Sequence, residues 1–174
     1  HWLHFSSKDL IHWKEEGIAL KPSETYDIGW GCFSGSAIEK DGKLYVLYTG
    51  SSYGKQTQCL ASSNDGHNFT KYEGNPVISQ KDLPEGYTDN DFRDPKIFFK
   101  YVHYYVLTAC RHVKGYSSIL LFKTDDLIHY SFVNVLKTFD NPMPLKSDGM
   151  VECPDIIFDG DKCALIYSLQ HQPQ

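Results

Sequence analysis

Two carboxylic acids in this sequence, Asp94 and Glu152, lie in segments that recur at a constant interval. Glu152 follows Arg93, the neighbour of Asp94, by 59 residues, and Arg93 follows Ser34 by the same interval (152 − 93 and 93 − 34). The arginine beside Asp94 is expected to keep that carboxylate ionised, as an acceptor of hydrogen bonds. Glu152 has no cation beside it in the sequence, so it is expected to hold a proton more readily. The two acids can therefore play different roles.

These residues belong to a block that recurs three times along the chain. The blocks are Phe33-Ser34-Gly35-Ser36-Ala37-Ile38, Phe92-Arg93-Asp94-Pro95-Lys96-Ile97 and Val151-Glu152-Cys153-Pro154-Asp155-Ile156. Each block precedes a turn and a second apolar run, and a Ser/Thr-x-Asp marker recurs at Ser7, Ser63 and Thr124. A period of about 40 to 60 residues, made of short β-rich runs, is typical of propeller blades. The sequence therefore predicts an all-β repeat protein.

The repeat also predicts where the chemistry lies. In a propeller the innermost strands run side by side around a central channel, so residues at one register converge on the axis. Ser34, Arg93 or Asp94, and Glu152 are therefore expected to line one pocket. The 174 residues hold about three units, whereas closed propellers usually have roughly four to eight blades. We expect residues 1–174 to form a single, incomplete propeller domain of about three four-stranded antiparallel blades.

Hairpin signals support this reading. Asp41-Gly42 and Asp159-Gly160 each separate two apolar runs, as a tight β-turn would. The third equivalent turn, within residues 100–103, lacks glycine. Residues 58–62 and 118–123 are expected to be third strands. The outer strands are expected to carry Trp13, Tyr72 or Phe132.

Composition excludes several classes of protein. The chain has 17 basic and 22 acidic residues, a net charge of −5 without a basic cluster, so nucleic acid is not an expected partner. The longest apolar stretch, residues 97–107, is too short to span a bilayer, so no membrane partner is expected. Five cysteines without C-x-x-C spacing favour free thiols in a reducing compartment, the cytoplasm. The eight histidines show no metal-ligand pattern.

The blocks around residues 32–37, 92–96 and 152–155 resemble three ordered motifs of glycoside hydrolase family 32, the invertases and sucrose-6-phosphate hydrolases. Residues 7–13, 48–50 and 58–62 resemble connecting segments of the same family, so the similarity covers nearly the whole chain. The resemblance implies a five-bladed β-propeller that cleaves β-D-fructofuranosides, such as sucrose or sucrose 6-phosphate, with retention of configuration. It implies water as the acceptor and no metal or organic cofactor.

The resemblance also implies roles for residues. Asp94 matches the family's transition-state stabiliser, and Glu152 matches its general acid/base. The family's nucleophilic aspartate lies in an Asn-Asp-Pro-Asn-Gly motif, which this sequence lacks. Two Asn-Pro pairs occur in this sequence, Asn75-Pro76 and Asn141-Pro142, and both lack the aspartate that stands between asparagine and proline in the motif. We therefore expect the 174-residue chain to be inactive by itself.

Four further residues are expected to contact substrate: Trp2, Phe33, Ser34 and Arg93. The aromatic faces of Trp2 and Phe33 suit the apolar side of a sugar ring. Trp2-Leu3-His4 resembles the family's Trp-Gly-His motif, with leucine in place of glycine. Val151 stands where bacterial members commonly carry tryptophan. A structural role for Trp2 is an equally open interpretation.

Other functions remain open at the level of sequence. A non-catalytic carbohydrate-binding propeller would keep Ser34, Arg93 and Asp94 and bind a sugar without catalysing a reaction. A fructosyltransferase would share the site and differ in the acceptor of the fructosyl group. In each case the partner is a fructose-containing small saccharide. An open stack of blades would also leave strand edges exposed, which predicts self-association.

Overall fold

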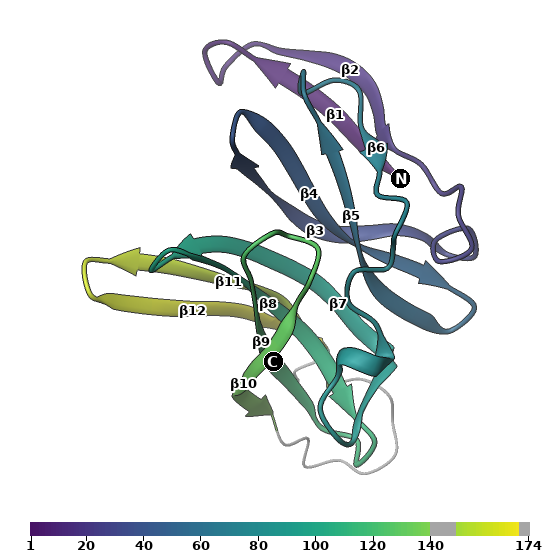
Figure 1. Cartoon of the computed structure of the whole chain (residues 1–174), viewed down its shortest axis with the longest axis vertical. Helices are drawn as coiled ribbons and strands as arrows, with labels where there is room; N and C mark the ends of the chain where they lie inside the picture. The colour runs from purple at the N-terminus through teal and green to yellow at the C-terminus, as the bar shows by residue number, and fades with distance from the viewer. Residues whose placement is uncertain (140–148, 171–174) are drawn as a thin grey trace.

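The computed structural model describes residues 1–139 and 149–170, and these residues form twelve β-strands and one short 3₁₀ helix (Figure 1). Asn141-Pro142 lies outside the described residues. The elements are β1 (Trp2–Ser7), β2 (Trp13–Leu20), β3 (Gly31–Lys40), β4 (Lys43–Ser52), β5 (Lys55–Ser63), β6 (Thr70–Lys71), η1 (Gln80–Asp82), β7 (Tyr87–Lys100), β8 (His103–His112), β9 (Ser117–Thr124), β10 (Ser131–Phe139), β11 (Val151–Asp159) and β12 (Lys162–Leu169). The described residues include no helix that is long and apolar enough to cross a membrane.

The strands form two complete blades and two half blades. The complete sheets have the strand orders β3-β4-β5-β6 and β10-β9-β8-β7, and the two-stranded sheets are β1-β2 and β11-β12. All of the pairings are antiparallel. The prediction of about three four-stranded blades of an all-β propeller is confirmed. Two blades are complete, and the remaining four strands are divided between the two half blades. Residues 58–62 and 118–123 lie in the third strands β5 and β9, as predicted.

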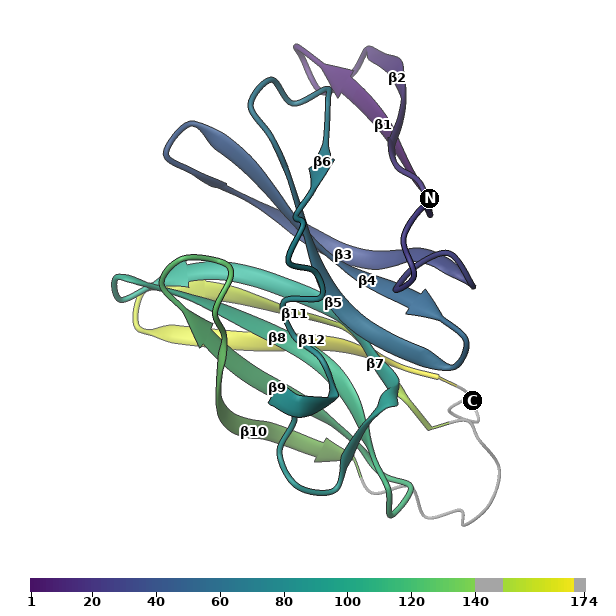
Figure 2. The same cartoon turned by 45° about the vertical axis from the view of Figure 1, so that its right-hand side comes forward.

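The outer strands were predicted almost correctly. Trp13 begins β2 and Phe132 lies in β10, whereas Tyr72 comes directly after the two-residue strand β6. Figure 2 shows the sheets arranged one after another, with β1 and β2 at one end of the molecule.

The continuous apolar runs of the middle strands are explained by burial on both sheet faces. Successive side chains of a strand point to opposite faces. In β4, Val46 and Tyr48 pack in a cluster that faces Leu20 of β2, while Leu47 packs in a second cluster with Phe92 of β7. A third cluster, around Leu107, Ile119 and Val151, fills the space between the β7–β10 sheet and β11. Each apolar cluster therefore holds one sheet against the next.

Each innermost strand contains a bulge with one extra residue, and β7 has a second, larger irregularity between Thr88 and Phe92. The register shifts between Cys32 and Gly35 in β3, between Arg93 and Lys96 in β7, and between Glu152 and Asp155 in β11. Such bulges interrupt the ladder and change the direction of nearby side chains. The three bulges fall within the recurring blocks that the sequence singled out.

The hairpin turns show a one-residue departure from equal spacing. The pair that closes each hairpin is Lys40↔Lys43 in the first case and Lys100↔His103 in the second, which are 60 residues apart. Counted from these turns, the equivalent of Arg93 in β3 is Phe33, not Ser34. The turn without glycine has positive φ at both Tyr101 and Val102 (49° and 64°), which a β-branched residue rarely adopts.

A second type of turn, capped by a hydroxyl group, follows each of the strands β1, β5 and β9. In each turn a Ser or Thr hydroxyl accepts two backbone N–H bonds, and the following Asp Oδ1 accepts two more. The hydroxyls belong to Ser7, Ser63 and Thr124. Short polar side chains that bond to nearby backbone groups favour such turns. The turn therefore marks the end of the third strand of a blade.

Ser36 links two innermost strands. Its hydroxyl donates to the carbonyl of Pro95 (2.8 Å) and accepts the N–H of Ile97 (2.8 Å). Ser36→Ala would leave both backbone groups without this partner, at a cost of about 1–3 kcal/mol in the free energy of unfolding. Urea denaturation should show this loss. Ser34→Ala, two residues away on the same strand, is the matched control because Ser34 is exposed and should change stability little. Equal effects of the two substitutions would contradict the assignment.

Asp27 is fully buried and pairs with Lys71 on β6. Burial raises the pKa of Asp27, but Lys71 and the backbone N–H groups of Glu24 and Ser23 together lower that pKa below its ordinary value. A carboxyl with a lowered folded-state pKa stabilises the protein above its unfolded pKa, and this contribution is lost as the pH falls.

Asp27→Asn should therefore destabilise the chain by about 3 kcal/mol or more at pH 7, since one partner of a buried pair remains. The difference from the unchanged protein should shrink as the pH is lowered below the ordinary range of aspartate titration. Urea unfolding at several pH values measures both effects. Asp125→Asn, at an exposed side chain, is the control. A stability deficit that does not depend on pH would argue against the ion pair.

Candidate active site

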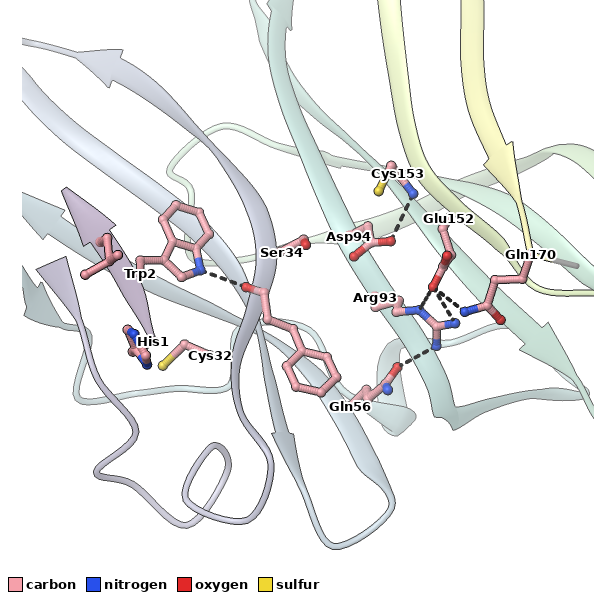
Figure 3. A pocket seen from close by; sticks show the side chains of 12 residues that line it. His1, Trp2, Cys32, Ser34, Gln56, Arg93, Asp94, Glu152, Cys153 and Gln170 are labelled. Carbon is pink, nitrogen blue, oxygen red and sulfur yellow. Dashed lines mark hydrogen bonds and ion pairs between the residues drawn. The ribbon is translucent and has the colours of Figure 1, made fainter. Parts of the chain in front are cut away.

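The recurring blocks surround one cavity of about 870 Å³ (Figure 3). Its lining comes from β1, β3, β5, β7 and β11 and from the residues next to β1 and β12. The lining residues are His1, Trp2, Leu3, Cys32, Phe33, Ser34, Gln56, Arg93, Asp94, Glu152, Cys153 and Gln170. Every residue that the sequence predicted for the site, including both Phe33 and Ser34, therefore lies at the same cavity.

One oxygen of Glu152 accepts two hydrogen bonds and forms an ion pair. Arg93 Nε (3.1 Å) and Gln170 Nε2 (2.8 Å) donate to Oε1, and a terminal guanidinium nitrogen of Arg93 lies 3.0 Å from the same oxygen. The expectation that Glu152 lies away from any cation is wrong. Arg93 is distant in sequence, but the bulged strands β7 and β11 are neighbours and bring the two side chains together. The second oxygen, Oε2, has no hydrogen bond to another described residue.

Arg93 is shared between two acids. Besides Glu152, its guanidinium donates to Asp91 Oδ1 (2.7 Å) and to Gln56 Oε1 (3.3 Å). Asp91 Oδ2 in turn accepts from Arg111 Nε (2.6 Å). Burial lowers the pKa of Arg93, but the hydrogen bond that it donates to Asp91 and the charges of Asp91, Glu152 and Asp94 together raise it. Arg93 is therefore a fixed positive charge at the wall of the cavity.

Asp94 is held by backbone and hydroxyl groups. Its N–H donates to Thr49 Oγ1 (3.0 Å), and its Oδ2 accepts the N–H of Cys153 from the neighbouring strand (2.9 Å). Arg93 and Asp94 are adjacent in sequence but form no hydrogen bond or ion pair with each other, because the guanidinium is directed to Glu152 (Figure 3) and to Asp91. Adjacent side chains on a strand point to opposite sides, and here the bulge intervenes as well.

The backbone is strained at two facing positions of the cavity. Asp94 has φ +59° and Cys153 has φ +49°, a region that side chains other than glycine adopt rarely. Both residues lie inside the bulges of β7 and β11. Strained residues of this kind cluster at functional sites.

Burial and the charges of Asp94 and Glu152 raise the pKa of the Cys153 thiol, which therefore stays protonated near neutral pH.

Aromatic residues form the opposite side of the cavity. Trp2 Nε1 donates to the carbonyl of Phe33 (2.9 Å), which ties β1 to β3 (Figure 3). Ser34 is exposed, and its hydroxyl has no hydrogen bond to another described residue. Leu3 also lines the cavity, at the position where the sequence departs from the Trp-Gly-His motif. The aromatic side and the charged side thus face each other.

Sequence reasoning missed three residues of this network: Gln56, Asp91 and Gln170. Gln56 lies on β5, and its Oε1 also accepts the N–H of Phe92 (2.9 Å). Gln170 directly follows β12. Neither glutamine is part of a recurring block, so only the arrangement of the strands reveals them. Asp91 stands two residues before Arg93, and this short spacing is the one feature of the sequence that could have indicated their ion pair.

Asp94 and Glu152 are the carboxylates that line the cavity within residues 1–139 and 149–170. Over the same residues, no group of three or more His, Cys, Asp or Glu side chains is arranged to hold a metal ion. The described arrangement supplies two carboxyl groups in different environments, which can accept hydrogen bonds and transfer protons.

Comparison with known proteins agrees with this geometry. The profile of the Glycosyl hydrolases family 32 N-terminal domain matches residues 1–172. A sucrose-6-phosphate hydrolase from Klebsiella pneumoniae is 39% identical over 170 residues, which are 95% of this chain and 35% of the relative. The corresponding enzyme of Bacillus subtilis is 37% identical over 175 residues, which are 97% of this chain and 35% of the relative.

Among solved structures, a family 32 β-fructofuranosidase from Bombyx mori has a TM-score of 0.83 and 40% identity, and the match covers 100% of this chain and 36% of that one. The chain thus spans about a third of the length of the relatives it matches. Because the family profile covers nearly the whole sequence, the chain belongs to glycoside hydrolase family 32.

Proposed function

We propose that the chain is the part of a β-fructofuranosidase that carries the general acid/base and the transition-state stabiliser. The observation that supports this most directly is the placement of Glu152 and Asp94 on neighbouring strands at one cavity. Retaining hydrolysis needs a nucleophilic carboxylate and a second carboxyl group that protonates the leaving oxygen. Residues 1–174 then belong to a single propeller domain, of which they form an incomplete part.

The proposed substrate is a small fructose-containing saccharide, sucrose or sucrose 6-phosphate. The bacterial relatives are named sucrose-6-phosphate hydrolases, and a mutant of the Bombyx mori enzyme was solved in complex with sucrose. The cavity of about 870 Å³ falls in the size range of small-molecule sites. Its aromatic side, Trp2 and Phe33, suits the apolar face of a sugar ring, and Ser34 and Arg93 supply polar contacts.

Glu152 is the proposed general acid/base, and the geometry favours one of its oxygens for proton transfer. Oε1 accepts hydrogen bonds from Arg93 Nε and Gln170 Nε2 and forms an ion pair with the Arg93 guanidinium. An oxygen that accepts bonds from donors cannot direct a proton toward them, so the proton is placed on Oε2. In the first step this proton passes to the leaving oxygen as its bond to the anomeric carbon breaks and a nucleophilic carboxylate bonds to that carbon; the 174 residues contain no match to the motif that carries this carboxylate. In the second step Glu152 takes a proton from the water that attacks the anomeric carbon and displaces the nucleophilic carboxylate.

Arg93 holds the general acid/base in position. Its guanidinium binds Asp91 Oδ1 (2.7 Å) on one side and Glu152 Oε1 on the other. We propose that Asp91 fixes the orientation of the guanidinium, so that Glu152 is directed into the cavity. Arg111 binds the far oxygen of Asp91 and keeps that carboxylate in place.

Asp94 is the proposed acceptor of sugar hydroxyl bonds. One of its oxygens, Oδ2, is occupied by the N–H of Cys153 (2.9 Å). The other oxygen, Oδ1, has no hydrogen bond to a described residue. Hydrogen bonds between a hydroxyl and a carboxylate are short and strong, and they gain strength as positive charge develops on the sugar ring. Asp94 would therefore bind the fructosyl group and stabilise its transition state.

Two further properties accompany this proposal. Three of the five cysteines, Cys32, Cys59 and Cys110, are buried free thiols, which fits a reducing compartment such as the cytoplasm. The half blades leave strand edges without a partner among the described residues, and we propose that copies of the chain associate through these edges.

Fructose binding tests the role of Asp94 directly. Asp94→Asn keeps the size of the side chain and removes the charge, so we expect fructose affinity measured by calorimetry to fall about tenfold or more. Asp161→Asn, in the turn between β11 and β12, removes the same charge away from the cavity and should leave affinity unchanged. Equal affinity of the Asp94→Asn variant and the unchanged chain would refute the proposed role.

Sucrose turnover tests the need for a nucleophile. The sequence contains no Asn-Asp-Pro-Asn-Gly motif, so the 174-residue chain should bind fructose but release none from sucrose. Product release is measured by fructose detection after long incubation. If fructose is released and Glu152→Gln abolishes the release, a carboxylate of this chain serves as the nucleophile and the proposal of inactivity is wrong. Release that survives Glu152→Gln would instead remove Glu152 from the mechanism.

A further inference from the structure

The strained segment that carries Asp94 needs support from outside its own sheet. The bulge of β7 leaves Asp94 without a paired residue on β8. Asp94 is buried, and its φ is +59°. A buried backbone N–H without a partner is costly, and so is a left-handed φ at a residue other than glycine. Contacts with a neighbouring element must therefore stabilise this conformation.

That support comes from Thr49 of β4 and Gln58 of β5, which are directly paired in the β3–β6 sheet. Thr49 Oγ1 accepts the N–H of Asp94 (3.0 Å) and donates to Gln58 Oε1 (3.0 Å). Gln58 Nε2 donates to the carbonyl of Phe92 (2.9 Å). This chain of hydrogen bonds begins at the N–H of Asp94 and ends at the carbonyl of Phe92, so it holds the segment on both sides of Arg93.

The chemistry of the groups fixes the direction of this hydrogen-bond chain. A backbone N–H can only donate, so the oxygen of Thr49 has to accept from Asp94. The single hydroxyl proton of Thr49 is then available for the amide oxygen of Gln58, and the amide NH₂ of Gln58 is available for a carbonyl. Both side chains are fully buried, where water does not replace a lost partner. The loss of one group therefore leaves the others without their partners.

The next blade lacks this polar pair. Ala109 of β8 is the equivalent of Thr49, because each lies six residues after the residue that closes its hairpin (109 − 103 and 49 − 43). Ala109 pairs with Ile119, and both pack in the apolar cluster that contains Val151. Packing between blades therefore does not require a polar pair at this position. The pair occurs at the junction where Asp94 lies.

The bulge of β11 is held in a different way. Cys153 is the equivalent of Asp94, 59 residues later (153 − 94), and its φ is also positive. Its N–H donates to Asp94 Oδ2 (2.9 Å) instead of to a hydroxyl group of the neighbouring sheet. Thr49 thus binds the backbone of Asp94, and the carboxylate of Asp94 binds the backbone next to Glu152. Both acids of the cavity depend on Thr49 in this order.

We propose that Thr49 and Gln58 are positioning residues for Asp94. They hold the bulge of β7 in the left-handed conformation that directs the carboxylate of Asp94 toward the cavity. Neither residue is among the described residues that line the cavity, so both act through Asp94 and not on the sugar itself. The inference rests on the proposed role of Asp94 in binding fructose, and it adds the residues that keep Asp94 in place.

Thr49→Val tests this role with a side chain of similar shape that has no hydroxyl group. Fructose affinity, measured by calorimetry, should fall about three- to tenfold, as expected for the loss of one buried hydrogen bond. Thr49→Ser keeps the hydroxyl and should restore the affinity to within about twofold of the unchanged chain. Thr108→Val is the matched control, because Thr108 is also fully buried but its hydroxyl has no partner in the described structure. Unchanged affinity of Thr49→Val, or an equal loss in Thr108→Val, would overturn the proposal.

Gln58→Leu tests whether the two residues act as one unit. Fructose affinity should fall in this variant too, because the hydroxyl of Thr49 loses the acceptor that orients it. Thr49→Val combined with Gln58→Leu should lose no more affinity than the weaker of the two single variants, since either change alone breaks the chain of hydrogen bonds. Losses that multiply in the double variant would show two independent contributions and would overturn the proposed unit.

Hydrogen exchange of single amides, measured by NMR, separates this inference from the role of Asp94 in sugar binding. In the unchanged chain the amides of Asp94 and Cys153 should exchange slowly, because each has a protein acceptor. Thr49→Val should accelerate exchange at both amides about tenfold or more, and Thr108→Val should not. Rapid exchange at Asp94 in the unchanged chain would overturn the inference even if Thr49→Val does not fold. Unchanged fructose affinity of Asp94→Asn would instead refute the proposed role of Asp94.

Discussion

The structure depends on sheets that are apolar on both faces. A strand such as β4 buries Val46 and Tyr48 on one side and Leu47 on the other, so its sheet needs a neighbour on each side. Stacking satisfies this need, and the right-handed twist of each sheet turns the stack around an axis. The innermost strands then lie next to one another, which brings residues that are about 59 positions apart to one cavity.

The bulges convert that general arrangement into a specific site. One extra residue in β3, β7 and β11 interrupts the regular alternation of side chains where the strands approach the axis. Asp94 and Cys153 occupy the bulges with positive φ, and the N–H of Cys153 binds the carboxylate of Asp94. The carboxylate of Glu152 is held at the same time by Arg93 and Gln170. Two acids at one cavity thus have different partners, which suits different roles.

The same need for neighbours explains the ends of the fold. β11 and β12 bury one face against the β7–β10 sheet, and β1 and β2 pack against the β3–β6 sheet through Trp2 and Leu20. Where a complete blade would continue, Leu3 and Ile166 remain exposed. Among the described residues, the exposed apolar area coincides with the free strand edges, so a strand that pairs along either edge would cover both.

The sequence by itself determined the repeat, the all-β class, the hairpins and the residues of the recurring blocks, because alternation and turn chemistry are local properties of the chain. Tertiary structure alone decided the partners of those residues. Arg93 binds Glu152 and Asp91 instead of Asp94, Phe33 instead of Ser34 is its equivalent in β3, and Gln56 and Gln170 join the network from strands outside the blocks. These contacts depend on a one-residue change in register and on which strands become neighbours, and neither is encoded in the spacing of the motifs.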